Sequence, residues 1–128
     1  MKLLIDTHLL IWSITNPSKL SEAARKVLTD ANSECYFSSA TIWEIAIKHK
    51  KHPDDMPISA EMARRLFAES GCSELPVFSK HSAAVERLPA LHADPFDRIL
   101  VAQATVEDMK LLTHDGLIPG YCEFVIKV

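Results

Sequence analysis

The chain has 128 residues, of which 48% are hydrophobic and 24% are charged, and its net charge at pH 7 is −3. This length and composition are typical of a soluble globular protein with enough core to fold without crosslinks, and we expect a single domain over residues 1–128. A negative net charge is not typical of a simple nucleic-acid-binding protein. Nucleic-acid binding can therefore be inferred for this chain only from particular residues and not from its net charge.

The three cysteines, Cys35, Cys72 and Cys122, are far apart and odd in number, and none belongs to a zinc-ligand motif. The sequence therefore predicts neither a disulfide framework nor a zinc site, and Cys35 and Cys122 are interpreted as small core residues. We expect a reducing, cytoplasmic location. No apolar stretch is long enough to span a membrane, and Asp6 interrupts the apolar start of the chain, unlike in a signal peptide.

Short apolar runs alternate with helical patterns along the chain. In the first half we expect a strand at Lys2–Ile5, helices at His8–Ile14 and Leu20–Ala31, a strand at Cys35–Ser38, and helices at Ala40–Lys50 and Ile58–Glu69. In the second half we expect a strand at Leu75–Phe78, a helix at Ser79–Leu88 capped by Ser79 or Ser82, a helix at Pro95–Asp108 capped by Asp94, and strands at Lys110–Thr113 and Glu123–Val128. This alternation predicts an α/β fold with a largely parallel sheet of about five strands.

Four acidic residues follow the expected strands or begin the helices after them. Asp6 and Asp115 come after the first and fourth strands, Glu44 lies in the first turns of the helix after the second strand, and Asp97 lies in the first turn of the helix that begins at Pro95. In an open α/β sheet, ligands bind outside the carboxyl ends of the strands. The sequence therefore predicts that the four carboxylates share one edge of the sheet.

Each acid also has a purely structural interpretation. Asp6 can cap the first helix, and Asp97 can complement a helix dipole. Thr41 and Glu44 have the spacing of a capping box, and Asp115 precedes a glycine as in a turn. Considered separately, the four positions favour these structural roles.

Considered together, the four acids favour a metal site. Two carboxylates about 4 Å apart repel by about 4 kcal/mol at an effective dielectric constant of about 20, so a cation is expected among them. Mg²⁺ or Mn²⁺ suits such oxygen ligands, and a site of this kind is suited to phosphodiester hydrolysis. With only three glycines, the chain has no glycine-rich phosphate loop.

Four segments, LLIDTHLLIW, SSATIWEIAIK, LHADPFDRILVAQA and LLTHD, closely resemble the motifs of PIN-domain nucleases in family order, and the resemblance covers nearly the whole chain. The chain looks most like the VapC-type toxins of bacterial toxin–antitoxin pairs. The resemblance implies an α/β/α sandwich around a parallel sheet and endonucleolytic cleavage of RNA that depends on Mg²⁺ or Mn²⁺. It also implies an antitoxin partner and a homodimer.

The resemblance also implies roles for individual residues. Asp6, Glu44, Asp97 and Asp115 match the four acids of the family, and Thr7 and Thr113 match hydroxyl positions that support the site. We expect Asp6 and Asp97 to be the main metal ligands. Glu44 is expected to position or deprotonate water, and Asp115 to bind a second metal or act through water.

Other polar residues near these motifs have open roles. Asp94 is an extra carboxylate with a complete role as a helix cap, and Arg98 can contact phosphate or pair with Asp94 or Glu107. His8, His92 and His114 lack the spacing of a paired-histidine metal site, and we expect solvent-facing or supporting roles for them. His114 is the best candidate among them for a substrate contact.

The acidic net charge is largely a property of the expected site, because without its four acids the chain carries +1. The basic run at residues 48–52, with Arg64 and Arg65, is either an RNA path or an ordinary solvated helix end. Two helices, at residues 9–14 and 42–47, are apolar on almost every side. They are either buried centrally or covered by a second copy or an antitoxin segment.

Two alternative functions stay open. The first is a non-catalytic PIN-like module that binds RNA or protein, which the loss of an acid would favour; no acid is lost. The second is a magnesium-dependent phosphohydrolase of another α/β class, which is disfavoured because Asp6-Thr7-His8 lacks the second aspartate of that nucleophile motif.

Overall fold

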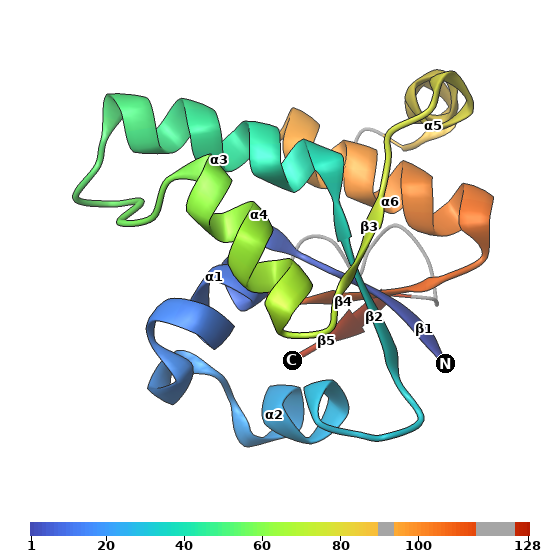
Figure 1. The fold of residues 1–128 in the computed structure, drawn as a ribbon. Helices are drawn as coiled ribbons and strands as arrows, with labels where there is room; N and C mark the ends of the chain where they lie inside the picture. The colour runs from blue at the N-terminus through green and yellow to red at the C-terminus, as the bar shows by residue number, and fades with distance from the viewer. Residues whose placement is uncertain (90–93, 115–124) are drawn as a thin grey trace.

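A sheet of five parallel strands in the order β3-β2-β1-β4-β5 lies at the centre of the computed structural model, which describes residues 1–89, 94–114 and 125–128 (Figure 1). The strands are β1 (Lys2–Ile5), β2 (Glu34–Ser38), β3 (Ser73–Leu75), β4 (Lys110–Thr113) and β5 (Val125–Lys127). The helices are α1 (Thr7–Thr15), α2 (Glu22–Leu28), α3 (Ser39–Lys51), α4 (Ala60–Glu69), α5 (Ser79–Ala84) and α6 (Pro95–Glu107), with 3₁₀ turns at Pro17–Lys19 and Val85–Arg87.

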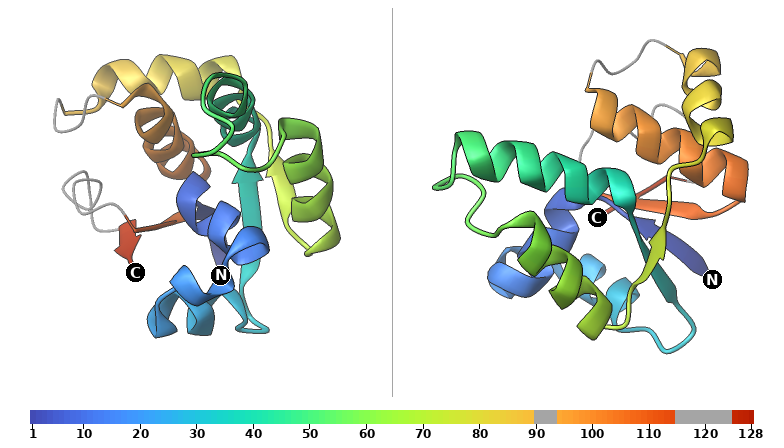
Figure 2. Two further views of the ribbon diagram at one scale, coloured as in Figure 1. Left: turned by 90° about the vertical axis from the view of Figure 1, so that its left-hand side faces the viewer. Right: turned by 45° about the horizontal axis from the view of Figure 1, so that its top comes forward.

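The sheet is covered by helices on both faces (Figure 2). On β1, Leu3 and Ile5 face a core formed with α1, α2 and α4, whereas Leu4 faces a second core formed with α6. This alternation is the period of two that a strand buried on both faces requires. The expected three-layer α/β/α sandwich and parallel sheet of five strands are therefore confirmed.

Most expected elements are present, and their ends differ from the expected ones by at most four residues. The expected bounds of the third strand are wrong, because β3 runs over Ser73–Leu75 and not over Leu75–Phe78. Pro76 has no backbone N–H for the ladder with β2, and the N–H of Val77 donates to Ser39 Oγ at 3.0 Å. The strand therefore ends at the proline, and its polar start hides it from a search for apolar runs.

The ends of α6 fix the segment that leads into the sheet. Asp94 caps its start as expected, with Oδ1 accepting from the N–H of Phe96 at 2.8 Å. At its other end Asp108 adopts a left-handed conformation with φ of 54°, and Met109 N–H donates to Ala104 O at 2.9 Å. This tight turn leads directly into β4. None of the helices in the described residues is both long and apolar enough to cross a membrane.

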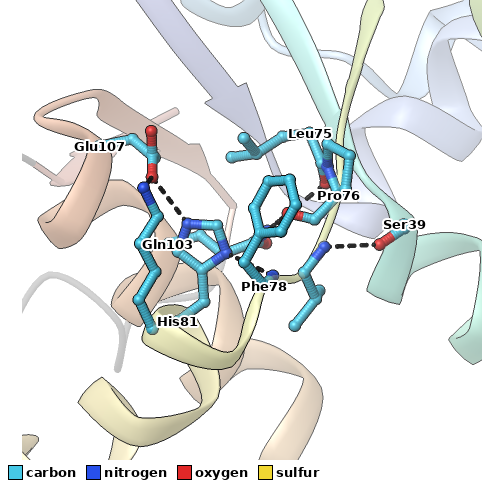
Figure 3. Close-up of polar contacts among 9 residues, drawn as sticks. Ser39, Leu75, Pro76, Phe78, His81, Gln103 and Glu107 are labelled. Atoms are coloured by element: carbon cyan, nitrogen blue, oxygen red, sulfur yellow. Dashed lines mark hydrogen bonds and ion pairs between the residues drawn. The ribbon is translucent and has the colours of Figure 1, made fainter.

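A buried histidine joins α5 to α6 (Figure 3). The cap of α5 is Phe78, not Ser79 or Ser82, and its N–H donates to His81 Nδ1 at 2.9 Å. Because Nδ1 accepts this bond, Nε2 carries the ring proton and donates to Glu107 Oε2 at 2.8 Å. Glu107 also pairs with Lys80 at 3.1 Å. His81 is fully buried, and the contact fixes α5 on the helix that carries Asp97.

A second polar contact fastens the end of β3 to the same helix. Gln103 is fully buried on α6, and its Nε2 donates to the carbonyls of Leu75 at 3.4 Å and Pro76 at 3.2 Å (Figure 3). The backbone hydrogen bonds between β3 and β2 end at these carbonyls. The side chain of Gln103 therefore provides hydrogen bonds that the sheet no longer supplies.

Glu107→Gln tests the contact with His81 through its pH dependence. The hydrogen bonds from His81, then Lys80, lower the pKa of Glu107 from its ordinary 4.5. Its stabilising contribution is therefore complete above pH 4.5 and lost as the pH falls through the folded-state pKa. We expect the variant to lose about 1 kcal/mol at neutral pH, and progressively less as the pH falls below 4.5, measured by urea unfolding.

The control is Glu61→Gln, a carboxylate with a side chain that is 82% exposed on α4. It should unfold like the unsubstituted chain at neutral and acidic pH. An equal loss for Glu107→Gln at acidic and neutral pH would contradict the assigned role of the charge.

Candidate functional site

Asp6 is buried at the carboxyl edge of the sheet, between β1 and α1. Its Oδ1 accepts from the N–H of Leu9 at 3.0 Å, which confirms the expected helix cap. Its Oδ2 accepts from Thr113 Oγ1 at 2.5 Å and from the N–H of His114 at 3.0 Å. The side chain is only 4% exposed, so one carboxylate joins the end of β1 to the end of β4.

Glu44 is the second buried acid, and it lies one turn into α3. Thr7 Oγ1 donates to Glu44 Oε1 at 2.7 Å. Thr7 has a single hydroxyl proton, so the hydroxyl of Thr41, 3.1 Å away, must donate to Thr7. The side chain of Glu44 is 4% exposed, and this chain of hydrogen bonds holds it against the start of α1.

The capping-box interpretation of Thr41 and Glu44 is wrong. Ser38 is the N-cap of α3, and its hydroxyl accepts from the N–H of Ala40 at 3.0 Å. The helix therefore begins earlier than the spacing suggested, and Thr41 and Glu44 lie inside it. Their side chains are free of the capping role and contact Thr7 instead.

Lys48 brings a positive charge to this edge. Its Nζ lies 2.5 Å from Glu44 Oε2, one helical turn along α3. Burial lowers the pKa of Lys48, but the carboxylate of Glu44, and then Asp94 and Asp97, outweigh it and raise that pKa. The start of α6 therefore lies within electrostatic reach of Lys48. Sequence reasoning assigned Lys48 to the basic run at residues 48–52 and missed its pairing with Glu44, although the i,i+4 spacing was a usable signal.

Asp97 lies half-buried in the first turn of α6, three residues after its cap. Its N–H is 3.4 Å from Asp94 Oδ1, so the two carboxylates are held on the same helical turn. Arg98 donates to the carbonyls of Pro89 at 3.0 Å and Val85 at 3.3 Å. Arg98 thereby links the start of α6, which carries Asp97, to residues 85–89.

Two of the expected site residues, Asp115 and His92, lie outside the described residues. Within residues 1–89, 94–114 and 125–128, no three acidic, histidine or cysteine side chains are close enough to form a metal site by themselves. The donor chemistry nevertheless fits a hard divalent cation, because the groups gathered here are carboxylates and one already binds the ammonium group of Lys48.

Aromatic and basic side chains lie beside the acids. The rings of Trp12 and His114 meet edge to face at 5.0 Å, and the ring of His8 lies 5.9 Å from that of Trp12. A cavity of about 330 Å³ adjoins them, and its lining includes His8, Trp12, Lys48 and His52. From the sequence, Trp12 was assigned only to the apolar helix at residues 9–14 and not to the site.

A second, largely apolar cavity lies between α3, α5 and α6. Its volume is about 470 Å³, and its lining includes Trp43, Val77, Val85, Phe96 and Ile99. The side chains of Trp43 and Phe96 meet edge to face at 5.3 Å, yet Trp43 is 64% exposed. The apolar helix at residues 42–47 is therefore buried on the side that faces the sheet and exposed to solvent on the side that faces this cavity.

Comparison with known proteins gives both a family and two structural relatives. Residues 3–119 match the family model described as PIN domain. The structure resembles that of VapBC2 from Rickettsia felis bound to a DNA fragment from its promoter, with a TM-score of 0.72 and 16% identity over 100% of this chain and 98% of that chain. It also resembles a toxin–antitoxin complex from Klebsiella pneumoniae, with a TM-score of 0.67 and 19% identity over 98% and 96% of the two chains. No curated protein sequence matches the chain.

The substitutions Asp6→Asn and Asp97→Asn test which of these two acids is needed for the stability of the fold. In Asp6→Asn an amide NH₂ replaces one oxygen of a buried group that accepts three hydrogen bonds, so a donor is left facing a donor. We expect a loss of about 1–3 kcal/mol in the free energy of unfolding. Asp97→Asn removes charge at a half-buried position, and we expect a change below about 0.5 kcal/mol or a gain.

Both variants are measured by urea unfolding in the presence of a chelator. A loss for Asp97→Asn as large as that for Asp6→Asn would contradict this division, and would make stabilisation of the start of α6 the main role of Asp97.

Proposed function

The chain belongs to the PIN domain family, and from that membership we propose that it is a divalent-metal-dependent endoribonuclease, the toxin of a toxin–antitoxin pair. The observation on which the proposal rests is the burial of two carboxylates, Asp6 and Glu44, at the carboxyl edge of the sheet, 4% and 3% exposed. Such burial is costly unless hydrogen bonds or a cation compensate it. Both acids have hydroxyl donors, and Glu44 has a cation.

In this proposal Asp6 and Asp97 hold the metal, and Asp115 holds a second metal or acts through water. When bound, Mg²⁺ or Mn²⁺ lowers the pKa of a bound water and neutralises charge that develops on the phosphate. Glu44 orients the attacking water or accepts its proton. Thr113 and Thr7 hold Asp6 and Glu44 in place through the hydrogen bonds described above.

Lys48 is proposed as a positioning residue for Glu44. Its Nζ bonds Oε2 while Thr7 bonds Oε1, so each carboxylate oxygen of Glu44 has a partner. One of these two bonds must therefore break before Glu44 can accept a proton. The ammonium group on Oε2 is the partner that an RNA phosphate can also attract, because it is 40% exposed.

The proposed RNA path includes only part of the basic run at residues 48–52. Lys48 pairs with Glu44, and His49 Nδ1 lies 2.7 Å from Met56 O, so both are engaged within the fold. Lys50 and Lys51 are exposed at the end of α3 and are the residues of this run that we assign to phosphate contacts. The rings of His8, Trp12 and His114 offer faces and edges for bases beside them.

A protein partner is supported by the relatives and by an exposed apolar surface. Both structural relatives are toxin–antitoxin complexes. In this chain Trp43 is exposed beside the cavity of about 470 Å³, which is the kind of surface that an interface covers. We propose an antitoxin and a second copy of the chain as partners. A short open reading frame directly upstream of the gene would support the toxin–antitoxin assignment.

The decisive experiment is cleavage of structured RNA by the purified chain with Mg²⁺ or Mn²⁺. We expect a chelator and Asp97→Asn each to abolish cleavage, because the proposed hydrolysis needs both the metal and its ligand. Products are followed on denaturing gels, with folding checked by circular dichroism.

The matched control is Asp30→Asn, an exposed acid just before β2, at the opposite end of the sheet. It should cleave like the unsubstituted chain. Cleavage that persists both with chelator and in Asp97→Asn would exclude the metal mechanism. RNA binding without any cleavage would instead favour the non-catalytic module.

Lys50→Gln combined with Lys51→Gln tests the RNA path. Each phosphate contact contributes about 0.7 to the slope of log affinity against log salt for single-stranded RNA, so we expect that slope to fall by about 1.4 and affinity to fall at low salt. Binding is measured by fluorescence anisotropy in an Asp97→Asn background with chelator.

The double variant Lys2→Gln with Lys26→Gln removes the same charge from exposed positions on β1 and α2 and should leave the slope unchanged. Equal effects of the two double variants would show that only net charge matters, and would exclude a defined path along α3.

A further inference from the structure

Two cysteines that are distant in the sequence lie side by side on neighbouring strands. The parallel register of β2 and β3 pairs Tyr36 with Ser73, which places Cys35 opposite Cys72 one residue earlier. Neighbouring strands are about 4.7–4.9 Å apart, a separation within the Cα range of about 4.4–6.8 Å that disulfides span. Both thiols are free and half-buried.

The pair borders a cavity of about 240 Å³ on the α1 and α2 side of the sheet. Leu9, Leu10 and Leu28 contribute apolar walls, and Ser33 and Ser70 contribute hydroxyl groups. The Ser70 hydroxyl donates to Cys72 Sγ at 3.9 Å. A small neutral oxidant therefore has both space and a polar contact next to the two sulfur atoms.

The two thiols differ in their acidity. A hydrogen bond from the Cys35 thiol, against the opposing effect of burial and with help from Ser70, lowers the pKa of Cys72 to about 7. The same contact, together with burial, raises the pKa of Cys35. Cys72 is thus the nucleophile of the pair, and Cys35 is the thiol that follows.

We propose that a peroxide converts Cys35 and Cys72 into a reversible intrachain disulfide. Cys72 Sγ attacks one peroxide oxygen and the O–O bond breaks, which gives a sulfenic acid on Cys72, and the released oxygen leaves as water after taking the thiol proton. Cys35 Sγ then attacks Cys72 Sγ, the S–O bond breaks, and a second water leaves with the Cys35 proton. Two thiols and one hydrogen peroxide become one disulfide and two waters, with two electrons passing to the peroxide.

The bond would join β2 to the edge strand β3 and close the loop of residues 36–71. That loop contains α3 and α4, and with them Glu44. Oxidation would therefore fix the amino ends of β2 and β3, at the edge of the sheet opposite the site, without adding any group to the site itself. The inference does not depend on the nuclease activity, because its chemistry uses only the two thiols.

The test is mild oxidation of the folded full-length chain carrying Cys122→Ser, followed by intact mass and peptide mapping. We expect one equivalent of hydrogen peroxide to remove both free thiols, to lower the mass by about 2 Da and to yield a linked Cys35–Cys72 peptide that dithiothreitol releases. In Cys35→Ser, the sulfenic acid on Cys72 should accumulate and react with dimedone. In Cys72→Ser, the remaining Cys35 should stay unmodified.

The unsubstituted chain is mapped in parallel, so that the result does not depend on how a variant folds. Free thiols on both Cys35 and Cys72 after peroxide treatment, a disulfide between two chains, or a link from either residue to Cys122 would overturn the proposal. Dimedone labelling of Cys35 in place of Cys72 would overturn the assigned order of attack.

Discussion

The carboxylate of Asp6 is the interaction on which the site depends. It accepts from the first turn of α1 through Leu9 N–H and from the end of β4 through Thr113 and His114 N–H. One buried group therefore satisfies a helix start and joins two neighbouring strands at their carboxyl ends. Because the same oxygens are the proposed metal ligands, folding and chemistry compete for the lone pairs of a single residue. A metal at this position must share Asp6 with the hydrogen bonds that orient it.

Glu44 extends this arrangement to the other side of α1. Thr7, the residue after Asp6, donates to Glu44, and Lys48 supplies charge to its second oxygen. The cost of burying the carboxylate is offset within α1 and α3, by a hydroxyl and an ammonium group. The opposite surface of α3 presents Trp43 to solvent. The helix α3 thus contributes both to the interior of the site and to an exposed apolar surface, which explains why its residues 42–47 are apolar on almost every side.

Sequence reasoning was sufficient for the features that depend on local pattern. Asp6, Glu44 and Asp97 follow strands or begin helices, and parallel topology brings such positions to one edge, so their general placement was predictable. The capping box at Thr41 failed because Ser38 begins the helix earlier, and only tertiary contact with Thr7 shows where Glu44 points. The bounds of β3 were predicted wrongly because a short edge strand with a polar start has no apolar signature. The pairing of Cys35 with Cys72 depends on the register between β2 and β3, which the sequence did not predict either.

The turn at Asp108 has a further consequence for the tolerated length of the chain. Its left-handed conformation, with φ of 54°, connects α6 to β4 through only Asp108 and Met109. An added residue there would turn the pleat of β4 by one position and exchange its two faces, so Thr113 would point away from Asp6. The longer connection between α3 and α4 has no such link to the sheet register. Insertions and deletions among related chains should therefore occur in the connection between α3 and α4 and be absent from the turn between α6 and β4.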